Sequence, residues 1–85
     1  MLRITRRLED AVPLVHLEGR LTRHEVGLLR EVLRSAANRI AVVDLSQLAF
    51  VDDAGVASLV DLRRRGLCIR GGSPFVRRLL EEVAP

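Results

Sequence analysis

The side chains that could carry chemistry are an acidic pair and two isolated histidines. Asp52 and Asp53 are adjacent and directly follow an apolar segment. Two carboxylates can share acid–base work, with His16 or His24 as a further titratable group. Adjacent carboxylates usually diverge, however, and no nucleophile, glycine-rich phosphate loop or metal-ligand spacing accompanies this pair. The sequence therefore predicts a protein that is not an enzyme and that takes no cofactor or metal.

A lone cysteine and a run of arginines are the other reactive or charged features. Cys68 excludes an internal disulfide, cannot hold a metal alone, and is expected as a small core side chain in a buried strand. Without a disulfide framework, the cytoplasm is the expected compartment. Arg63-Arg64-Arg65 complements the negative end of a helix dipole, or forms a basic rim that meets an acidic partner or anionic lipid.

Composition narrows the class of protein. The 85 residues are enough for one domain, 1–85, and the 48% hydrophobic content predicts a folded chain with an aliphatic core. All 14 basic residues are arginines, but 11 acidic residues leave a net charge of +3, which disfavours nucleic acid as a partner. No apolar run reaches the ~20 residues that span a bilayer, so we expect a soluble protein with no membrane span.

The first part of the chain predicts two strands. Residues 2–5 alternate apolar and polar, Glu9-Asp10 interrupts this pattern, and 12–17 is again mostly apolar, as in a hairpin. Pro13 lacks an amide donor and is expected at the beginning of the second strand.

A helix is expected next. Thr22 and Glu25 have the spacing of a capping box, in which the Thr22 hydroxyl accepts the amide of Glu25 and the Glu25 carboxylate accepts the amide of Thr22. The helix should end around Asn38. Its apolar face consists of Val26, Leu29, Val32, Leu33, Ala36 and Ala37.

The second half of the chain predicts short buried strands that alternate with helices. Ile40-Ala41-Val42-Val43 is continuous and largely β-branched, like a central strand buried on both faces of a parallel sheet. A loop from Asp44 to Asp53 is expected to lead into a second helix, which Gly66 stops. Leu67-Cys68-Ile69 is expected as another short buried strand.

The last element is expected to be a helix. Gly71-Gly72 turns the chain, and Ser73-Pro74 supplies a cap and a first-turn proline. The apolar face of this helix is Phe75, Val76, Leu79, Leu80 and Val83. The order β-β-α-β-α-β-α predicts an α/β fold, a mixed four-stranded sheet with helices packed against it.

Residues 42–59 resemble the signature of the STAS domain family, named for sulphate transporters and anti-sigma-factor antagonists. Members read hydrophobic-hydrophobic-Asp-Leu-Ser, a short spacer, then Phe-hydrophobic-Asp-Ser-Ser/Thr/Ala-Gly, and residues 42–46 and 50–55 follow most of this pattern. Residues 17–21 are similar to the family's second strand, and Ser73-Pro74 to its later Ser-Pro region. The resemblance covers nearly the whole chain and implies a STAS-like fold and a protein-binding function of the anti-sigma-factor-antagonist type.

The chain departs from the family pattern at the phosphorylation site. The resemblance implies that an anti-sigma-factor kinase would phosphorylate the serine after the signature aspartate, but Asp53 occupies this position and Ala54 removes the next hydroxyl. Asp53 is expected at the start of the second helix, as a fixed partial imitation of phosphoserine or as an N-cap bonded to the amide of Gly55 or Val56.

The neighbours of Asp53 allow further interpretations. Asp52 is expected to hold the preceding loop through backbone amides. Gly55 either leaves space for a partner or relieves crowding against the sheet. The predicted partner-binding residues are Asp44, Ser46, Asp52, Asp53, Ala54 and Gly55, with Arg63, Arg64 and Arg65 as a basic rim.

Two kinds of protein partner are compatible with the resemblance. In the preferred interpretation the partner is an anti-sigma factor or a related kinase. The alternative is that the chain is a small scaffold subunit of a larger assembly, such as a bacterial lipid-transport ATPase. A scaffold subunit needs no phosphorylation, so the missing serine fits this alternative somewhat better than a reversible switch. The sequence leaves the oligomeric state, including a homodimer, open.

Overall fold

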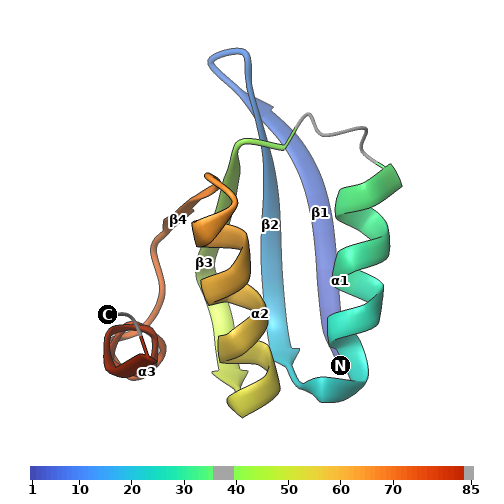
Figure 1. The fold of residues 1–85 in the computed structure, drawn as a ribbon. Coiled ribbons are helices and arrows are strands. Elements are labelled where there is room, and N and C mark those ends of the chain that lie inside the picture. The colour runs from blue at the N-terminus through green and yellow to red at the C-terminus, as the bar shows by residue number, and fades with distance from the viewer. Residues whose placement is uncertain (36–39, 84–85) are drawn as a thin grey trace.

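The computed structural model describes residues 1–35 and 40–83, which form one four-stranded sheet and three helices (Figure 1). The predicted order β-β-α-β-α-β-α and the α/β class are confirmed. In chain order the elements are β1 (Leu2–Glu9), β2 (Val12–Leu21), α1 (Arg23–Ser35), β3 (Val42–Val51), α2 (Asp53–Arg64), β4 (Cys68–Arg70) and α3 (Pro74–Val83).

The sheet is mixed, with the strand order β1-β2-β3-β4. β1 pairs with β2 in the antiparallel sense, whereas β2–β3 and β3–β4 are parallel. Both parallel crossovers step to the next strand in the same direction, so right-handed connections bring α1 and α2 to the same face of the sheet, as Figure 1 shows. α3 follows the short strand β4 and contacts α2 and β3.

The β1–β2 hairpin forms as predicted. Its turn residues, Asp10 and Ala11, both have positive φ, 50° and 66°. This left-handed pair is typical of the two-residue turns whose twist matches that of the flanking strands. Pro13 is the second residue of β2, and its carbonyl accepts a hydrogen bond from the amide of Ala41 (2.9 Å), which follows the α1 crossover.

The capping box at α1 differs in part from the prediction. The Glu25 carboxylate accepts the Thr22 amide (3.0 Å) as expected, but the Thr22 hydroxyl donates to that carboxylate instead of accepting the Glu25 amide. The amide of Glu25 bonds to the backbone carbonyl of Thr22 (2.9 Å). These hydrogen bonds from Thr22 lower the pKa of Glu25. The predicted end of the helix near Asn38, with Ala36 and Ala37, lies outside the described residues.

The predicted loop from Asp44 to Asp53 is wrong, because β3 continues to Val51 and Asp53 already belongs to α2. The strand also begins at Val42 and not at Ile40. Its parallel partner β2 is long, and the pairing runs from Leu14 opposite Val42 to Leu21 opposite Val51. Two register shifts along this ladder show local bulges in β3, which disturb the alternation that marks a strand in sequence.

The prediction that Cys68 lies in a buried strand is also wrong. β4 is an edge strand that runs from Cys68 to Arg70, and the Cys68 side chain is exposed. An edge strand has a neighbour on one side only, and in the described part of the chain β4 pairs with Val42–Asp44 of β3.

The last helix begins as predicted, since the Ser73 hydroxyl accepts the amide of Val76 (3.2 Å). Val76 and Leu80 are buried and Leu79 is partly buried, but Phe75 is 49% exposed and stacks on Phe50, with ring centroids 6.1 Å apart. The side chain of Val83 lies outside what the structure describes.

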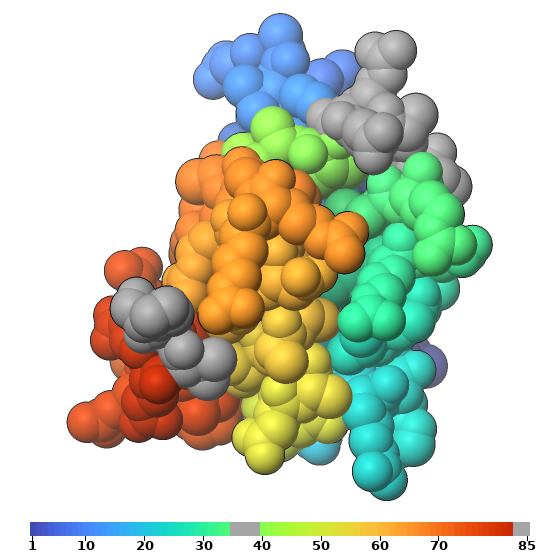
Figure 2. Space-filling view, viewed as in Figure 1, coloured from blue at the N-terminus to red at the C-terminus, as the bar shows by residue number. Residues whose placement is uncertain are grey.

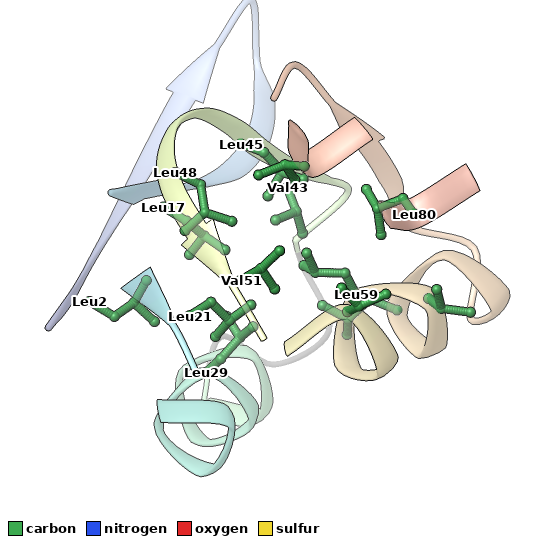
Figure 3. Packing of buried hydrophobic residues seen from close by; sticks show 14 of the residues in the cluster. Leu2, Leu17, Leu21, Leu29, Val43, Leu45, Leu48, Val51, Leu59 and Leu80 are labelled. Atoms are coloured by element: carbon green, nitrogen blue, oxygen red, sulfur yellow. The ribbon is translucent and has the colours of Figure 1, made fainter. Parts of the chain in front are cut away.

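The core lies between the sheet and the helices and is aliphatic, as predicted. Figure 3 shows side chains from the strands, such as Leu21 and Val51, meeting Leu29 of α1 and Leu59 of α2. This packing fixes both helices on the sheet and so fixes where each helix begins. The buried cluster contains Leu2, Val15, Leu17, Leu21, Leu29, Val43, Leu45, Leu48, Val51, Val56, Leu59, Val60, Leu62, Val76 and Leu80.

Candidate functional site

Asp52, and not Asp53, is the N-cap of α2. It has extended backbone angles (φ −93°, ψ −177°), and its Oδ1 accepts the amide of Gly55 at 2.8 Å. Its Oδ2 accepts the amide of Arg23, the first residue of α1, at 2.9 Å. The amides of Gly55 and then of Arg23 lower the pKa of this carboxyl. The Asp52 carboxylate therefore joins the beginnings of α1 and α2. The sequence had instead predicted that it would hold the preceding loop.

Asp53 is the first residue of α2 and its side chain is exposed. Among the described residues it has no hydrogen-bond or ion-pair partner. The prediction that its carboxylate bonds the amide of Gly55 or Val56 is wrong, because Asp52 accepts the first of these amides and the second bonds to the Asp52 carbonyl (2.8 Å). A negative charge in the first helical turn is nevertheless well placed in the field of the helix dipole.

Gly55 relieves crowding against the sheet and is not an open approach for a partner. The residue is buried, and a Cβ there would collide with the carbonyl oxygen of Leu21 and with Cγ2 of Val51. The buried hydroxyl of Ser58 donates to the Gly55 carbonyl (2.8 Å). The backbone of α2 therefore lies directly on the ends of β2 and β3, which holds Asp53 in a fixed position.

A small notch beside Asp53 adds residues that the sequence did not single out. It lies between α2 and α3, has a volume of about 200 Å³, and is lined by Asp53, Val56, Ala57, Leu79 and Glu82. Two carboxylates thus flank an apolar floor. Leu79 and Glu82 are three residues apart, so they lie on the same side of a helix, which the sequence alone indicates. The packing of α3 on α2 then brings them close to Asp53.

Asp44 and Ser46 do not belong to this surface. They lie in the first half of β3, and the eight steps along the chain from Asp44 to Asp52 span roughly 25 Å of extended strand. Asp44 is 8% exposed, and its Oδ1 accepts the amide of Ser46 at 2.9 Å. The predicted set of site residues is therefore divided between two places.

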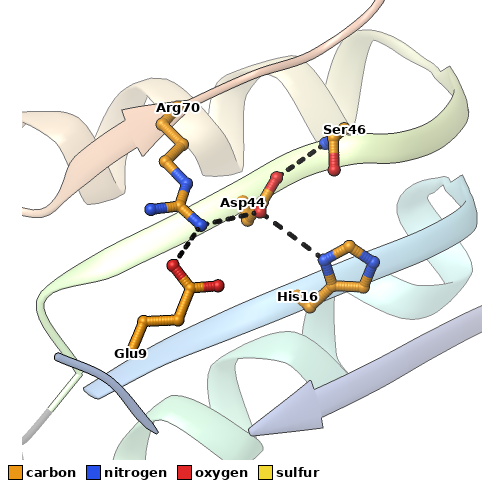
Figure 4. Close-up of polar contacts among 5 residues, drawn as sticks. All are labelled: Glu9, His16, Asp44, Ser46 and Arg70. Atoms are coloured by element: carbon orange, nitrogen blue, oxygen red, sulfur yellow. Dashed lines mark hydrogen bonds and ion pairs between the residues drawn. The ribbon is translucent and has the colours of Figure 1, made fainter. Parts of the chain in front are cut away.

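Around Asp44, the structure assembles a polar cluster from all four strands (Figure 4). Nη2 of Arg70 on β4 lies 3.1 Å from Oδ2 of Asp44 and 3.0 Å from Oε1 of Glu9 on β1. Nδ1 of His16 on β2 lies 3.7 Å from the same Asp44 oxygen. This cluster links the strands on the sheet face opposite α1 and α2.

The electrostatics of the cluster favour its ion pairs. Burial alone would raise the pKa of Asp44, but the hydrogen bonds from Ser46 and Arg70 outweigh it and lower the pKa. Glu9 and then Asp44 raise the pKa of Arg70. The alternative acid–base pairing of His16 with Asp52 or Asp53 is not assembled, because His16 pairs with Asp44 in the sheet register.

The three arginines after Leu62 differ in exposure. Arg63 is partly buried, whereas Arg64 and Arg65 are exposed. Arg65 is the C-cap of α2, and its Nε lies 3.1 Å from Oδ2 of Asp61. Gly66 follows with φ +100°, the left-handed conformation that ends the helix as predicted. These arginines lie at the opposite end of α2 from Asp53.

Two further features, a metal centre and a membrane-spanning helix, would also bear on function. Within residues 1–35 and 40–83, no three of His, Cys, Asp and Glu come together as a group that could hold a metal ion. No helix in this part of the chain is long and apolar enough to cross a membrane.

Comparisons with known proteins agree with the fold. A family model described as "Mlab, STAS domain" matches residues 4–84. The structure of the anti-sigma factor antagonist SpoIIAA in its unphosphorylated form is similar, with a TM-score of 0.71 and 21% identity over 94% of this chain and 79% of that chain. An uncharacterized protein of the DUF3478 family from Shewanella loihica, described as SpoIIAA-like in fold, has a TM-score of 0.57 and 16% identity over 99% and 80%. No curated protein sequence matches significantly.

Proposed function

Because the match over residues 4–84 makes this chain a member of the STAS domain family, we propose that it is a non-enzymatic protein-interaction module that docks through the start of α2. The proposal rests on the different environments of two neighbouring carboxylates, those of Asp52 and Asp53. Asp52 caps the helix and joins it to α1, which leaves the exposed Asp53 free for a partner. Asp53 then provides a permanent negative charge where other members carry a phosphorylatable serine.

The notch beside Asp53 indicates the chemistry of the partner. Its floor is apolar, and Asp53 and Glu82 flank it with negative charge. A lysine or arginine fits such a site, because its aliphatic stem packs on the floor while its charged end meets the carboxylates. The partner surface should therefore present a basic side chain to the beginning of α2.

A second candidate is a permanent scaffold subunit of a larger assembly, such as a lipid-transport ATPase. The absence of a hydroxyl at Asp53 and Ala54 favours it, because the charge at this position cannot be switched by phosphorylation. The two candidates share the docking surface and differ in whether the complex dissociates. A complex that stays intact on prolonged dilution supports the scaffold, and one that exchanges within seconds supports a signalling module.

Photo-crosslinking in cells tests the docking surface and captures whichever protein binds there. Benzoylphenylalanine in place of Ala57, which is exposed and lines the notch, should crosslink to one protein. Asp53→Arg in the same chain should remove this product. Benzoylphenylalanine in place of the exposed Arg3 on β1 is the matched control. A product that survives Asp53→Arg would show that the start of α2 is not the docking surface.

Substitutions of Asp53 test the role of its charge. Because Asp52 is the cap, Asp53→Asn and Asp53→Ala should lower the unfolding free energy by no more than about 1 kcal/mol, the usual contribution of a charge in the first helical turn. Both should weaken binding of the protein identified by crosslinking. Asp53→Ser restores a hydroxyl, and an anti-sigma-type serine kinase with ATP should phosphorylate only this variant within residues 52–55. Unchanged affinity in the Asn and Ala variants would refute the charge-reading role.

The predicted basic rim is tested separately. If Arg63, Arg64 and Arg65 lie at the edge of the interface, changing all three to Ala should mainly slow association, and the effect should shrink as salt increases. Equal association rates for the triple variant and the wild type in low salt would remove this turn from the interface.

A further inference from the structure

A second hollow lies at the other end of α2. Between the C-terminal halves of α1 and α2, which lie side by side in Figure 2, the surface forms an open groove of about 750 Å³. Asp53 and Arg65 are separated by twelve residues of helix, or about 18 Å along its axis. The groove is therefore distinct from the docking surface around Asp53.

The floor of the groove is apolar. Leu29 and Leu62 are almost fully buried beneath it, at 1% and 8% exposure. Leu33, Ile40 and Leu67 are only partly buried, and they pack on the core while leaving apolar surface toward the groove. Covering these three side chains would remove apolar area from water, which is the main favourable term in most protein association.

The walls of the groove carry a surplus of positive charge. Arg30 and Arg34 lie on the α1 side and Arg65 on the α2 side, whereas Asp61 is the one acidic side chain among the described residues that line it. Arg65 pairs with Asp61 at 3.1 Å and Arg34 with Glu31 at 3.2 Å. These pairs are exposed and hence weak, so the arginines can exchange them for acidic groups of a bound partner.

We propose that this groove binds an amphipathic α-helix of a partner protein whose apolar face is flanked by glutamate or aspartate. A trough between two helices with an apolar floor accepts the apolar stripe of a third helix. Acidic residues on both flanks of that helix would meet arginines on both walls. A single small anion is a poorer occupant, because the groove is partly open to solvent and small ligands need an enclosing site.

A designed peptide tests the proposal on the full chain. The probe is a fluorescein-labelled peptide of about 18 residues with leucines at helical spacing and glutamates on both flanks. The control peptide has lysine in place of each glutamate. We expect the glutamate peptide to bind and to shift the amide resonances of Leu33, Leu62 and Leu67, and we expect the lysine peptide not to bind.

Matched variants locate the binding. Arg30→Glu with Arg34→Glu should weaken the glutamate peptide at least about tenfold, whereas Arg78→Glu, at an exposed position on α3, should leave its affinity unchanged. If the double charge reversal lowers the melting temperature, Arg30→Ala with Arg34→Ala replaces it and should still weaken binding. Asp53→Asn should have no effect, so this experiment and those on the docking surface can fail independently.

Three results would overturn the proposal. The first is no binding of the glutamate peptide at millimolar concentration, and the second is binding that the arginine variants do not weaken. The third concerns dodecyl phosphate. If this compound saturates the groove and displaces the peptide at equal concentration, an amphiphilic anion is the occupant.

Discussion

Two glycine-to-alanine substitutions in helices should change stability in opposite directions. Alanine favours a helix interior over glycine by about 1 kcal/mol. At Gly27 on α1 an added Cβ meets no atom within 4 Å, so Gly27→Ala should stabilise the fold by up to about 1 kcal/mol. At Gly55 the same Cβ would collide with the backbone carbonyl of Leu21 and with the Val51 side chain.

The collision at Gly55 outweighs its gain in helix propensity. Overpacking usually costs about 1–3 kcal/mol, and the upper end applies here because a backbone carbonyl at the end of β2 cannot rotate away. After the gain of about 1 kcal/mol is subtracted, Gly55→Ala should destabilise by about 2 kcal/mol. The two variants should therefore differ by about 3 kcal/mol.

Urea denaturation followed by far-ultraviolet circular dichroism measures this difference. With a slope of about 1 kcal/mol/M, the midpoint should rise by up to about 1 M for Gly27→Ala and fall by about 2 M for Gly55→Ala. The slopes themselves should not change. If both midpoints move in the same direction, α2 does not lie as closely on β2 and β3 as described, and the fixed position of Asp53 loses its support.

Four further substitutions test other parts of the structure. Ala11→Gly should stabilise the hairpin turn by about 0.5–1 kcal/mol in a urea titration, because relief of the positive φ of 66° exceeds the entropy that glycine adds to the unfolded chain. Leu59→Ala should cost about 2–5 kcal/mol, whereas Leu28→Ala, at a half-exposed position, should stay within about 0.5 kcal/mol of wild type. The pKa of Asp52 is lowered in the folded state. The Asp52 carboxylate therefore stabilises the fold fully at a pH above the ordinary aspartate pKa, and this stabilisation is lost as the pH falls through the lowered pKa. Asp52→Asn should therefore flatten the loss of urea stability as the pH falls below the ordinary pKa range of an aspartate, and an unchanged slope would refute the cap.

Local patterns predicted most of the fold because each of those elements is determined by its own residues. Alternation predicted the hairpin, and the side chains of Thr22 and Ser73 marked the beginnings of α1 and α3. β3 was predicted too short because Asp44, Ser46 and Gln47 interrupt its apolar pattern. Its extended conformation depends on pairing with β2. The sequence of the β3 segment alone does not show that pairing.

The cluster around Asp44 depends on the register of the sheet. His16 lies opposite Asp44 in the β2–β3 pair, and Asp44 lies opposite Arg70 in the β3–β4 pair. These residues are distant in sequence, and a shift of one position would turn each strand's side chains to the other face. Sequence patterns predict that the strands exist but not this alignment, so they do not show that Asp44 lies in the sheet, apart from Asp53.

The assignment of the helix cap was wrong for a similar reason. Asp52 and Asp53 are both good N-cap residues, so intrinsic preference cannot choose between them. The choice depends on where β3 ends: Val51 is the last residue paired with β2, and the Asp52 amide still donates to the Leu21 carbonyl at 3.2 Å. That hydrogen bond holds Asp52 extended, as an N-cap must be, and makes Asp53 the first helical residue. The end of the sheet thus decides which carboxylate is used for structure and which is left exposed for a partner.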